Sequence, residues 1–473
     1  MKTLSRKIMK KRKVCVVVTA RPSYSRIKTA LKAIKSHENL ELQLVLAASA
    51  LLDRYGSAIN YILRDGFEIS AKVFNVLEGE SITSAAKTTG IGIVELSSVF
   101  DNLKPDMVVT IADRFETMST AIAASYMNIP LVHIQGGEVT GNIDEKVRHA
   151  ITKLADIHLV ASEKAKSRVI KMGEYPEKVF KTGCPSIDLA KEVKNNSKLD
   201  FNPYEKYGGV GHSFNLDKGY LVVMQHPVTN EYNLSREQIE ATLEAISNFD
   251  MPVFWFWPNV DAGSDGTSKG IRTYREHFKD KVKNIFFFKN MEGKDFLKLL
   301  INSKCLVGNS SVGIRECAYL GVPVVNIGSR QSGREKSKSV IDVDYDTVEI
   351  KEAVKKQITH GKYESHPIYG DGYAGEKISE AGENAAEGTA EETKVEMEQQ
   401  EEKFQAALTE GNEIHETLAG RSSLFTLSGY EELEDEYNKL EEEAAREQKE
   451  EDEDLEDEYN QLEEEAAREQ KEE

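Results

Sequence analysis

Two side chains of opposite charge follow an apolar run at 106–111. Asp113 and Arg114 stand side by side directly after this run, which has the character of a buried strand. An acid beside a base at the carboxyl end of such a strand is poorly placed for packing and well placed for chemistry. The alternative is a surface ion pair at the end of a strand.

The densest group of acids and bases comes from the next apolar run and the loop after it. His133 and Gln135 close that run, two glycines follow, and Asp144 opens a helical pattern. The glycines let the backbone approach a ligand closely. Several candidate acids and bases on one loop are what proton transfer at carbon requires. An ion pair between Asp144 and Arg148, four residues apart on a helix, is the structural alternative.

A third group of residues suits an anionic ligand. A strand ends before Ser310 and Ser311, which open a helix whose free N–H groups can bind phosphate. Glu316, about one and a half turns further on, could accept hydrogen bonds from a ribose diol. Arg330 and Arg334 follow the next strand, where arginines suit a diphosphate. A plain Asn/Ser helix cap is the alternative.

Four further candidates also follow strands. Arg21 and Ser25 come after the first strand, and His226 and Asn259 follow two later ones. Carboxyl ends of parallel strands share one edge of a sheet, so these side chains are expected to face one cleft. A plain strand–helix turn explains the first pair equally well, and a lone histidine is often a structural hydrogen-bonding group.

Short apolar runs alternate with helical patterns along most of the chain, which predicts parallel sheets covered on both faces. We expect an α/β fold with two Rossmann-like, doubly wound domains and the site in the cleft between them. The predicted strands are 13–20, 41–48, 106–111, 130–135, 157–161, 179–183, 220–225, 252–257, 285–288, 305–308 and 323–327. The predicted helices are 25–36, 82–103, 142–155, 236–249, 294–303, 313–320 and 348–359.

The predicted organisation has four parts. The first domain spans 1–190, a polar linker 191–219, the second domain 220–378, and an acidic low-complexity tail 379–473. In the tail, LEDEYNKLEEEAAREQKEE recurs as LEDEYNQLEEEAAREQKEE after 22 residues, a period that fits a helix of 3.67 residues per turn. It is expected to be a solvated, partly helical segment, with a partner-binding or oligomerisation element as the alternative.

Composition narrows the class of function. The 473 residues carry a net charge of −19, but residues 381–473 alone hold 34 acids and 8 bases, so the remainder is mildly basic. That balance suits a small anionic ligand and is too weak for nucleic acid. No apolar run approaches the roughly 20 residues of a membrane span. Four scattered cysteines without a CxxC pair indicate a cytoplasmic protein without a metal site.

Taken together, these segments resemble the UDP-N-acetylglucosamine 2-epimerase family, in its hydrolysing branch that makes N-acetylmannosamine for sialic acid synthesis. The resemblance covers residues 13 to 378 and is carried by ARPSYS, ADRFE, HIQGGEVTGNIDEKVRHAITKLA, GCPSID, QHPVT, WPNVDAGS, GNSSVGIREC, GSRQSGRE and IYGDG. It implies a GT-B-type fold and conversion of UDP-N-acetylglucosamine and water to N-acetylmannosamine and UDP through a glycal. It implies no cofactor, and a homo-oligomer, dimer or tetramer, is expected.

The resemblance also assigns residues. Proton transfer falls to Asp113, Asp144 and the position of Gln135, with His133 nearby. The UDP-binding positions are Arg21, Ser25, Arg114, His226, Asn259, Met291, Ser310, Ser311, Glu316 and Arg330.

This chain departs from the family at three points. Gln135 replaces a common glutamate, Ser23 replaces an acid, and the family's helix after YGDG is not apparent. An amide cannot take up a proton at neutral pH, so the carboxylates Asp113 and Asp144 must carry the chemistry, or activity is altered. The same reaction on a UDP-diacetamido sugar, a GT-B glycosyltransferase, and a nucleotide-sugar binding protein without turnover remain alternatives.

Overall fold

The chain divides into one compact unit, Met1–Thr389, and a second unit, Ala390–Glu473. The computed structural model describes residues 11–52, 58–77, 82–140, 143–258, 263–381 and 383. The second unit, which holds the repeated acidic segments, therefore lies outside the described residues. Every element below belongs to the first unit.

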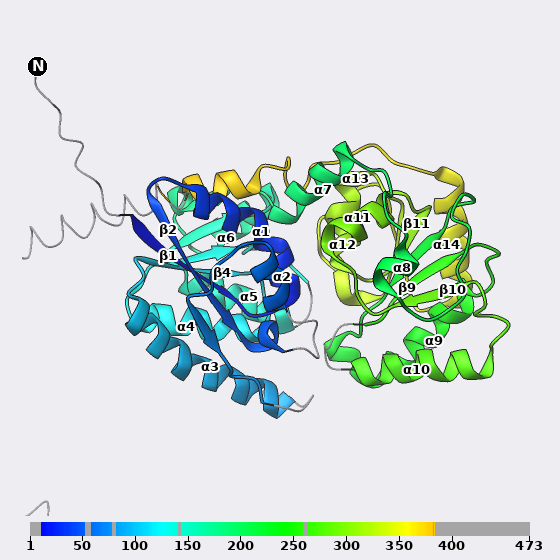
Figure 1. Ribbon diagram of the computed structural model, residues 1–473, viewed down its shortest axis with the longest axis horizontal. Coiled ribbons are helices and arrows are strands. Elements are labelled where there is room, and N and C mark those ends of the chain that lie inside the picture. Colours follow the sequence, from blue (N-terminus) through cyan, green and yellow to red (C-terminus); the bar gives the residue numbers. More distant parts are fainter. Residues whose placement is uncertain are drawn as a thin grey trace, which may run out of the picture. The chain divides into compact units, whose positions relative to one another are not determined.

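The first half of this unit is built on a seven-stranded parallel sheet with the strand order β3-β2-β1-β4-β5-β6-β7. Figure 1 labels its central strands β2, β1 and β4. The chain runs outward from β1 to β3 and then returns to start β4 beside β1, so the direction of winding reverses between β1 and β4. Ligands of such sheets bind outside the carboxyl ends of the strands at this point. The strands are β1 (Arg12–Val18), β2 (Leu40–Ala47), β3 (Ala71–Val73), β4 (Met107–Ile111), β5 (Leu131–Ile134), β6 (Ile157–Val160) and β7 (Val179–Lys181).

Helices cover both faces of this sheet because its strands are apolar on both sides. One face packs against α1 (Arg21–Ser36), α2 (Ala58–Arg64) and a helix over residues 374–381. The other face packs against α3 (Ile82–Leu103), α4 (Phe115–Tyr126) and α5 (Ile143–Leu154). A smaller cluster joins α6 (Glu163–Lys171) to β6 and β7.

The second half repeats the design with six parallel strands in the order β10-β9-β8-β11-β12-β13. These are β8 (Leu221–Met224), β9 (Val253–Phe256), β10 (Ile285–Phe288), β11 (Cys305–Gly308), β12 (Val324–Ile327) and β13 (Val340–Val343). One face carries α9 (Ser235–Ile246), α10 (Ser264–His277) and α14 (Thr347–His360). The other carries α7 (Pro185–Asn195), α11 (Gly293–Ile301) and α13 (Glu316–Leu320). The winding of this sheet reverses between β8 and β11. The predicted doubly wound α/β class is confirmed.

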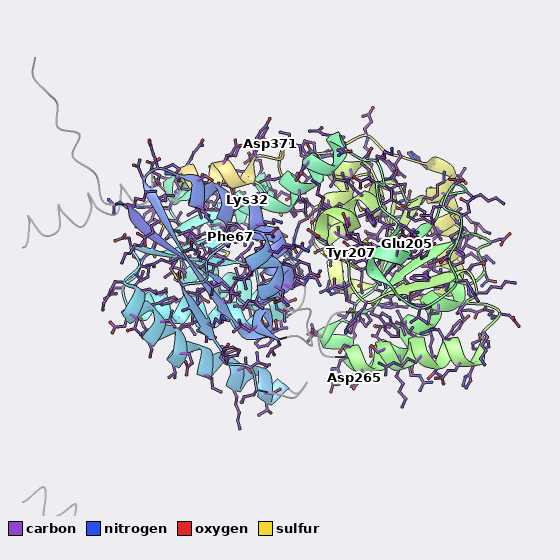
Figure 2. All side chains as sticks on the ribbon, viewed as in Figure 1. Lys32, Phe67, Glu205, Tyr207, Asp265 and Asp371 are labelled. Carbon is purple, nitrogen blue, oxygen red and sulfur yellow. The ribbon has the colours of Figure 1, made fainter. Side chains whose placement is uncertain are left out.

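The segment predicted as a polar linker is partly helical. It contains the end of α7 and the short α8 (Pro203–Tyr207). The Tyr207 hydroxyl donates a hydrogen bond of 2.6 Å to Asp295 of α11, and Tyr204 packs on Phe254 and Phe286 of the second sheet. Figure 2 shows Tyr207 on this helix. Residues before the second sheet thus already belong to its packing. Turns of 3-10 type complete the elements at η1 (Ala48–Leu51), η3 (Pro176–Lys178), η4 (Thr229–Leu234) and η5 (Ser329–Gln331).

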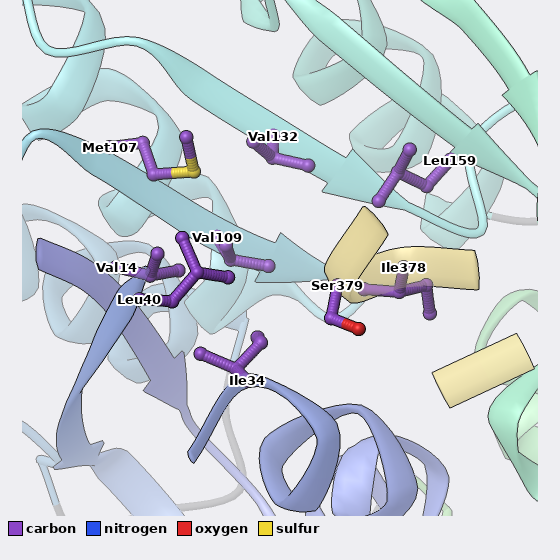
Figure 3. A pocket seen from close by; sticks show the side chains of 9 residues that line it. All are labelled: Val14, Ile34, Leu40, Met107, Val109, Val132, Leu159, Ile378 and Ser379. Atoms are coloured by element: carbon purple, nitrogen blue, oxygen red, sulfur yellow. The ribbon is translucent and has the colours of Figure 1, made fainter. Parts of the chain in front are cut away.

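The expectation that no helix follows YGDG is wrong. Residues 374–381 are helical, and Ile378 and Ala381 are 3% and 6% exposed within the core of the first half. Figure 3 shows Ile378 facing the strands that carry Val109 and Leu159. Asp188 holds the start of this helix through 2.8 Å hydrogen bonds from the backbone N–H groups of residues 374 and 375. The chain therefore returns from the second half to complete the first.

Within the described part of the chain, no helix is long and apolar enough to cross a membrane. The same residues include no group of three or more His, Cys, Asp or Glu side chains arranged to hold a metal ion.

Candidate functional site

The site is built where the strands of both sheets end. In the first half, β1 leads into α1 with Arg21, β4 ends before Asp113, and β5 ends before Gln135. In the second half, His226 follows β8 and Ser310 follows β11. β1 and β4, and likewise β8 and β11, flank the two points at which the winding reverses, where this class of fold binds ligands.

Direct contacts join these strand ends across the two halves. Arg26 of α1 donates a hydrogen bond of 3.2 Å from Nη2 to the Ser311 hydroxyl. Arg21 donates from Nη2 to the backbone oxygen of Met291 at 3.0 Å, and its guanidinium lies 4.5 Å from the centre of the Tyr61 ring. Arg21 and Met291, both predicted to bind nucleotide, thus contact each other.

The sequence-based prediction named Ser25 as a nucleotide-binding residue and did not name its neighbour Arg26. The prediction began the first helix at Ser25, whereas α1 begins at Arg21, with Pro22 in its first turn. Within α1, Ser25 is exposed and the next residue, Arg26, reaches the second half. A proline directly after Arg21 was the signal for the earlier start, because proline is favoured in the first turn of a helix.

A buried ion cluster lies at the same junction. Glu138, 5% exposed, accepts ion-pair contacts at Oε2 from Arg334 at 2.9 Å and from Arg315 at 3.4 Å. Burial alone would raise the pKa of Glu138, but Arg315, Arg334 and Arg26 outweigh it and hold that pKa below its usual value. Glu138 belongs to the first half and both partners to the second, so this carboxylate joins the two strand edges.

The arginines of the cluster respond differently to this environment. Burial lowers the pKa of Arg26 to about 10, with Arg315 adding repulsion. Burial likewise lowers the pKa of Arg148 and of Arg334, and neighbouring arginines contribute. For Arg315 burial acts in the same direction but Glu138 outweighs it, so its pKa is raised. Several cations held together at such a cost are suited to receive an anion.

Several polar atoms of this region are buried without a hydrogen-bond partner among the described residues. They are the Nε atoms of Arg148, Arg315 and Arg334, and the oxygens Glu138 Oε1, Glu316 Oε2 and Gln135 Oε1. Buried polar groups are nearly always hydrogen-bonded, and leaving one unpaired costs about 1–3 kcal/mol. Unused donors on cations beside unused oxygen acceptors fit a ligand that has both anionic and hydroxyl or amide groups.

Asp113 forms an ion pair with Arg148. The Arg148 guanidinium contacts Asp113 Oδ2 and donates from Nη1 to the backbone oxygen of Glu138 at 2.8 Å. Asp113 is 8% exposed. A guanidinium partner favours the charged form of a carboxylate, which accepts a proton rather than donating one. Asp144 lies in the first turn of α5, one turn before Arg148.

Gln135 has an unusual backbone and a buried side chain. Its φ of 66° lies in the left-handed region, and the residue is 1% exposed. The side-chain Nε2 donates to the sulfur of Cys184 at 2.8 Å, and its backbone N–H donates to Leu159. Since Oε1 has no partner among the described residues, the amide presents an acceptor to the site.

His133 occupies a supporting position. Its Nε2 lies 2.9 Å from the backbone oxygen of Ala112 and must donate to it, and its Nδ1 lies 3.1 Å from the Thr152 hydroxyl. Complete burial lowers the pKa of His133 to about 4, so the ring is neutral near pH 7. Both ring nitrogens are engaged inside the first half, so this histidine links the neighbouring strands β4 and β5.

Three more of the predicted nucleotide-binding residues lie at the strand ends of the second half. His226 and Ser310 lie at the strand ends of the second half, where Asn309 bonds both the N–H (2.7 Å) and the oxygen (2.8 Å) of the His226 backbone. Ser310 caps α12 (Ser311–Ile314), accepting from the N–H of Val312 at 3.5 Å. Arg330 donates from Nη1 to the backbone oxygen of Asn309 at 3.4 Å.

Two further predicted nucleotide-binding residues are Arg114 and Asn259. Arg114 makes a two-point pair with Glu116, at 3.1 and 3.0 Å, over the start of α4. Asn259 lies outside the described residues.

The predicted helix over 313–320 is two short helices. α12 has four residues and α13 has five, and they meet at Arg315, whose ψ of −70° departs from the helical value. A helix dipole grows with the number of aligned peptides, so four residues supply little of it. Anion binding here must therefore depend on individual N–H groups, hydroxyls and arginines.

Comparison with known proteins gives consistent matches. A family model described as UDP-N-acetylglucosamine 2-epimerase matches residues 32–382. A UDP-N,N'-diacetylbacillosamine 2-epimerase (hydrolyzing) of Legionella pneumophila is 34% identical over 366 residues, which cover 77% of this chain and 94% of the relative. A UDP-N-acetylglucosamine 2-epimerase of Neisseria meningitidis is 31% identical over 370 residues, 76% of this chain and 91% of the relative.

A solved structure supports the fold. The crystal structure of UDP-GlcNAc 2-epimerase from Neisseria meningitidis bound to UDP-GlcNAc aligns with a TM-score of 0.64 at 19% identity, over 78% of this chain and 98% of that one. The two-domain, GT-B-type architecture is therefore confirmed.

Proposed function

Because the chain belongs to the UDP-N-acetylglucosamine 2-epimerase family, we propose that it is a hydrolysing 2-epimerase of a UDP-linked 2-acetamido hexose. The observation that supports this most directly is the buried cluster at the strand ends. Among the described residues, it offers unpaired donors on arginines and unpaired oxygens on Glu138, Glu316 and Gln135. A nucleotide sugar carries the complementary groups, namely phosphate oxygens, hydroxyls and an amide.

The preferred substrate is a UDP-diacetamido sugar, with UDP-N-acetylglucosamine second. The sequence-based expectation had the opposite order. The relative named for UDP-N,N'-diacetylbacillosamine is 34% identical across 94% of its length, and the relative named for UDP-N-acetylglucosamine is 31% identical across 91%. This difference favours the diacetamido substrate, and both sugars belong in the test.

The proposed reaction has two steps. In the first, a base removes the proton at C2, the bond from C1 to the UDP oxygen breaks with its electron pair leaving on UDP, and a glycal forms. In the second, the oxygen of water bonds to C1 while water gives up one proton to a carboxylate, and an acid delivers a proton to C2 from the opposite face. The products are UDP and the free sugar inverted at C2. Positioned acid and base groups of this kind contribute about 10²–10⁴-fold in rate.

We assign the diphosphate to Ser310, Ser311, Arg26 and Arg330. Arg26 already donates to the Ser311 hydroxyl, so both would be within reach of one phosphate oxygen at this strand end. Charge developing on the leaving UDP is stabilised by donors that are already in position. Since α12 is so short, the arginines carry most of this stabilisation.

Asp113 is the proposed base at C2. The Arg148 contact favours its charged, proton-accepting form. Asp144, in the first turn of α5, is proposed as the acid that returns a proton to C2. Gln135 cannot take this part because an amide does not exchange a proton usefully at neutral pH.

Gln135 also supports a second candidate function, a nucleotide-sugar binding protein without turnover. A GT-B glycosyltransferase is the remaining alternative, since it would use a similar cleft to transfer the sugar to an acceptor.

One assay separates these functions. The protein is incubated in D₂O with UDP-N,N'-diacetylbacillosamine and, separately, with UDP-N-acetylglucosamine, and products are followed by NMR. A hydrolysing epimerase releases UDP and a free sugar inverted and deuterated at C2. Tight binding without UDP release would establish the binding protein instead. UDP release that requires an added acceptor and leaves C2 unchanged would establish a transferase.

We further propose a cytoplasmic location and a homo-oligomeric state, dimer or tetramer. All four cysteines are buried free thiols, as a reducing compartment allows. Light scattering of the purified protein at several concentrations measures the oligomeric state, and a monomer throughout would refute the second proposal.

A further inference from the structure

The amide of Gln135 is buried with one end bound and the other end unused. Nε2 donates to Cys184 Sγ at 2.8 Å, while Oε1 has no hydrogen-bond partner among the described residues. Gln135 is 1% exposed, so solvent does not replace the missing bond. An unpaired buried carbonyl oxygen costs about 1–3 kcal/mol, which a ligand N–H or O–H group would recover.

The backbone at Gln135 limits where this amide can point. Its φ of 66° is uncommon for a residue with a side chain, and such strain gathers at ligand sites. The backbone N–H is held by the oxygen of Leu159 at 2.8 Å. Gly137 follows, also with a positive φ, and a side chain there would meet the backbone oxygen of Ala165. The direction of the Gln135 side chain is thus set by the chain on both sides.

Cys184 is itself held firmly at the start of α7. Its backbone N–H donates to Tyr369 at 2.7 Å, and its sulfur lies 3.0 Å from the Ser186 hydroxyl. The residue is fully buried. Burial raises the pKa of the Cys184 thiol, so the sulfur is uncharged at neutral pH and serves as a neutral hydrogen-bonding group.

The Gln135–Cys184 pair lies beside the ion cluster. Cys184 packs in a buried cluster with Ile314, the residue directly before Arg315. The charge of Arg315 lowers the pKa of this thiol, although burial outweighs it. The unused oxygen of Gln135 is therefore in the same buried region as the unused donors of Arg315 and the unused oxygen of Glu316.

We propose that Cys184 is a positioning residue for the sugar part of the substrate. Its sulfur holds Nε2 of Gln135, which leaves Oε1 to accept a hydrogen bond from the acylamino N–H or a hydroxyl of the hexose. Without the sulfur, the amide can rotate and present its NH₂ group, which cannot accept a hydrogen bond. The inference rests on the proposed function and adds the group that reads the sugar. The nucleotide part is held by other residues, so Cys184 should matter for the sugar nucleotide and not for UDP alone.

The test compares Cys184→Ala and Cys184→Ser with a matched control, Cys15→Ala. Cys15 is an equally buried thiol in β1, within the core cluster that packs against α3–α5. For each variant, kcat and KM are measured with both sugar nucleotides, and the Kd of UDP by calorimetry. We expect Cys184→Ala to lower kcat/KM about tenfold through a higher KM, and to leave the Kd of UDP within about twofold of the wild-type value. Cys184→Ser should recover part of the loss in kcat/KM. Cys15→Ala should change neither kcat/KM nor the Kd of UDP.

A double-mutant cycle removes the ambiguity of a folding defect. In a Gln135→Leu background, Cys184→Ala should have no further effect on kcat/KM, because the group it positions is gone. An unchanged kcat/KM in Cys184→Ala, a parallel rise in KM and in the Kd of UDP, or additive losses in the double variant would each overturn the inference.

Failure of the proposed function would look different. If wild-type protein binds sugar nucleotide but releases no UDP, the Kd of the intact sugar nucleotide is measured in place of KM. Cys184→Ala should then raise the Kd of the sugar nucleotide and leave the Kd of UDP within about twofold. Wild-type protein that binds neither UDP nor sugar nucleotide overturns both proposals.

Discussion

Arg26 provides the sharpest test of how the two halves form a diphosphate site. Its guanidinium donates to the Ser311 hydroxyl at 3.2 Å. Burial and the charge of Arg315 lower its pKa to about 10, so it keeps its charge near pH 7.5. Replacing it with methionine keeps most of the apolar stem and removes the charged donor.

The expected loss follows from the type of bond removed. A hydrogen bond to a charged group contributes about 1.5–3 kcal/mol. At about 1.4 kcal/mol for each factor of ten, Arg26→Met should weaken UDP binding roughly 10- to 150-fold. Stability should not fall in parallel, because the substitution also removes a partly buried cation that Arg315 repels.

Calorimetric titration with UDP measures this loss, and Ser25→Ala is the matched control. Ser25 is the preceding residue of α1 and is exposed, so its truncation should leave the Kd of UDP unchanged. Ser311→Ala combined with Arg26→Met should cost less than the sum of the two single losses, because the two side chains bond to each other. If Ser25→Ala weakens UDP binding and Arg26→Met does not, the assignment of Arg26 is refuted.

Three further predictions test the fold, the pH response and the chemistry. A chain ending at Thr389 should fold and keep its turnover. A chain ending at Gly372 should lose several kcal/mol of unfolding free energy, because Ile378 no longer covers the core of the first half. Thermal unfolding measures the difference, and equal melting temperatures of the two chains would contradict this prediction. The free energy of unfolding should fall by about 3 kcal/mol as pH drops from 6.5 to 4, because His133 is protonated in the unfolded chain but stays neutral in the folded protein. Urea titration at the two pH values measures this fall, which should be smaller for His133→Asn. Asp113→Asn should lower kcat by about 10²–10⁴ and abolish deuterium uptake at C2 with UDP affinity intact, and NMR showing normal uptake would rule out this base.

The interior strands and the edge strands β7 and β10 could be predicted from the sequence, whereas the edge strands β3 and β13 could not. β1, β4, β8 and β11 are continuous apolar runs, and each was expected within two residues of its observed bounds. β3 (AKV) and β13 (VIDV) have three and four residues with partly exposed side chains, and they lie at the edges of their sheets. A short edge strand buries too little apolar surface to stand out in sequence.

The buried ion cluster shows why the site was only partly predictable. Glu138 pairs with Arg315 and Arg334, nearly 200 residues further along the chain. Each of these residues stands in a segment that the sequence singled out, but no local spacing indicates that they meet. Arg26 was missed for a different reason: successive side chains of a helix point about 100° apart, and the sequence does not show whether Ser25 or Arg26 faces the second half.

The buried His133 has a structural part to play among the proton-transfer candidates. Ala112, directly before Asp113, has a left-handed φ of 67°, and Gln135 at the end of the neighbouring strand has one of 66°. The His133 ring donates to the oxygen of Ala112 and so holds this strained turn, while Gly136 leaves room for the ring because a side chain there would meet His133 and Thr152. The directions of Asp113 and Gln135 thus depend on the same buried imidazole. A neutral, fully buried histidine serves this purpose because its hydrogen bond to Ala112 does not change across the pH range in which carboxylates exchange protons with substrate.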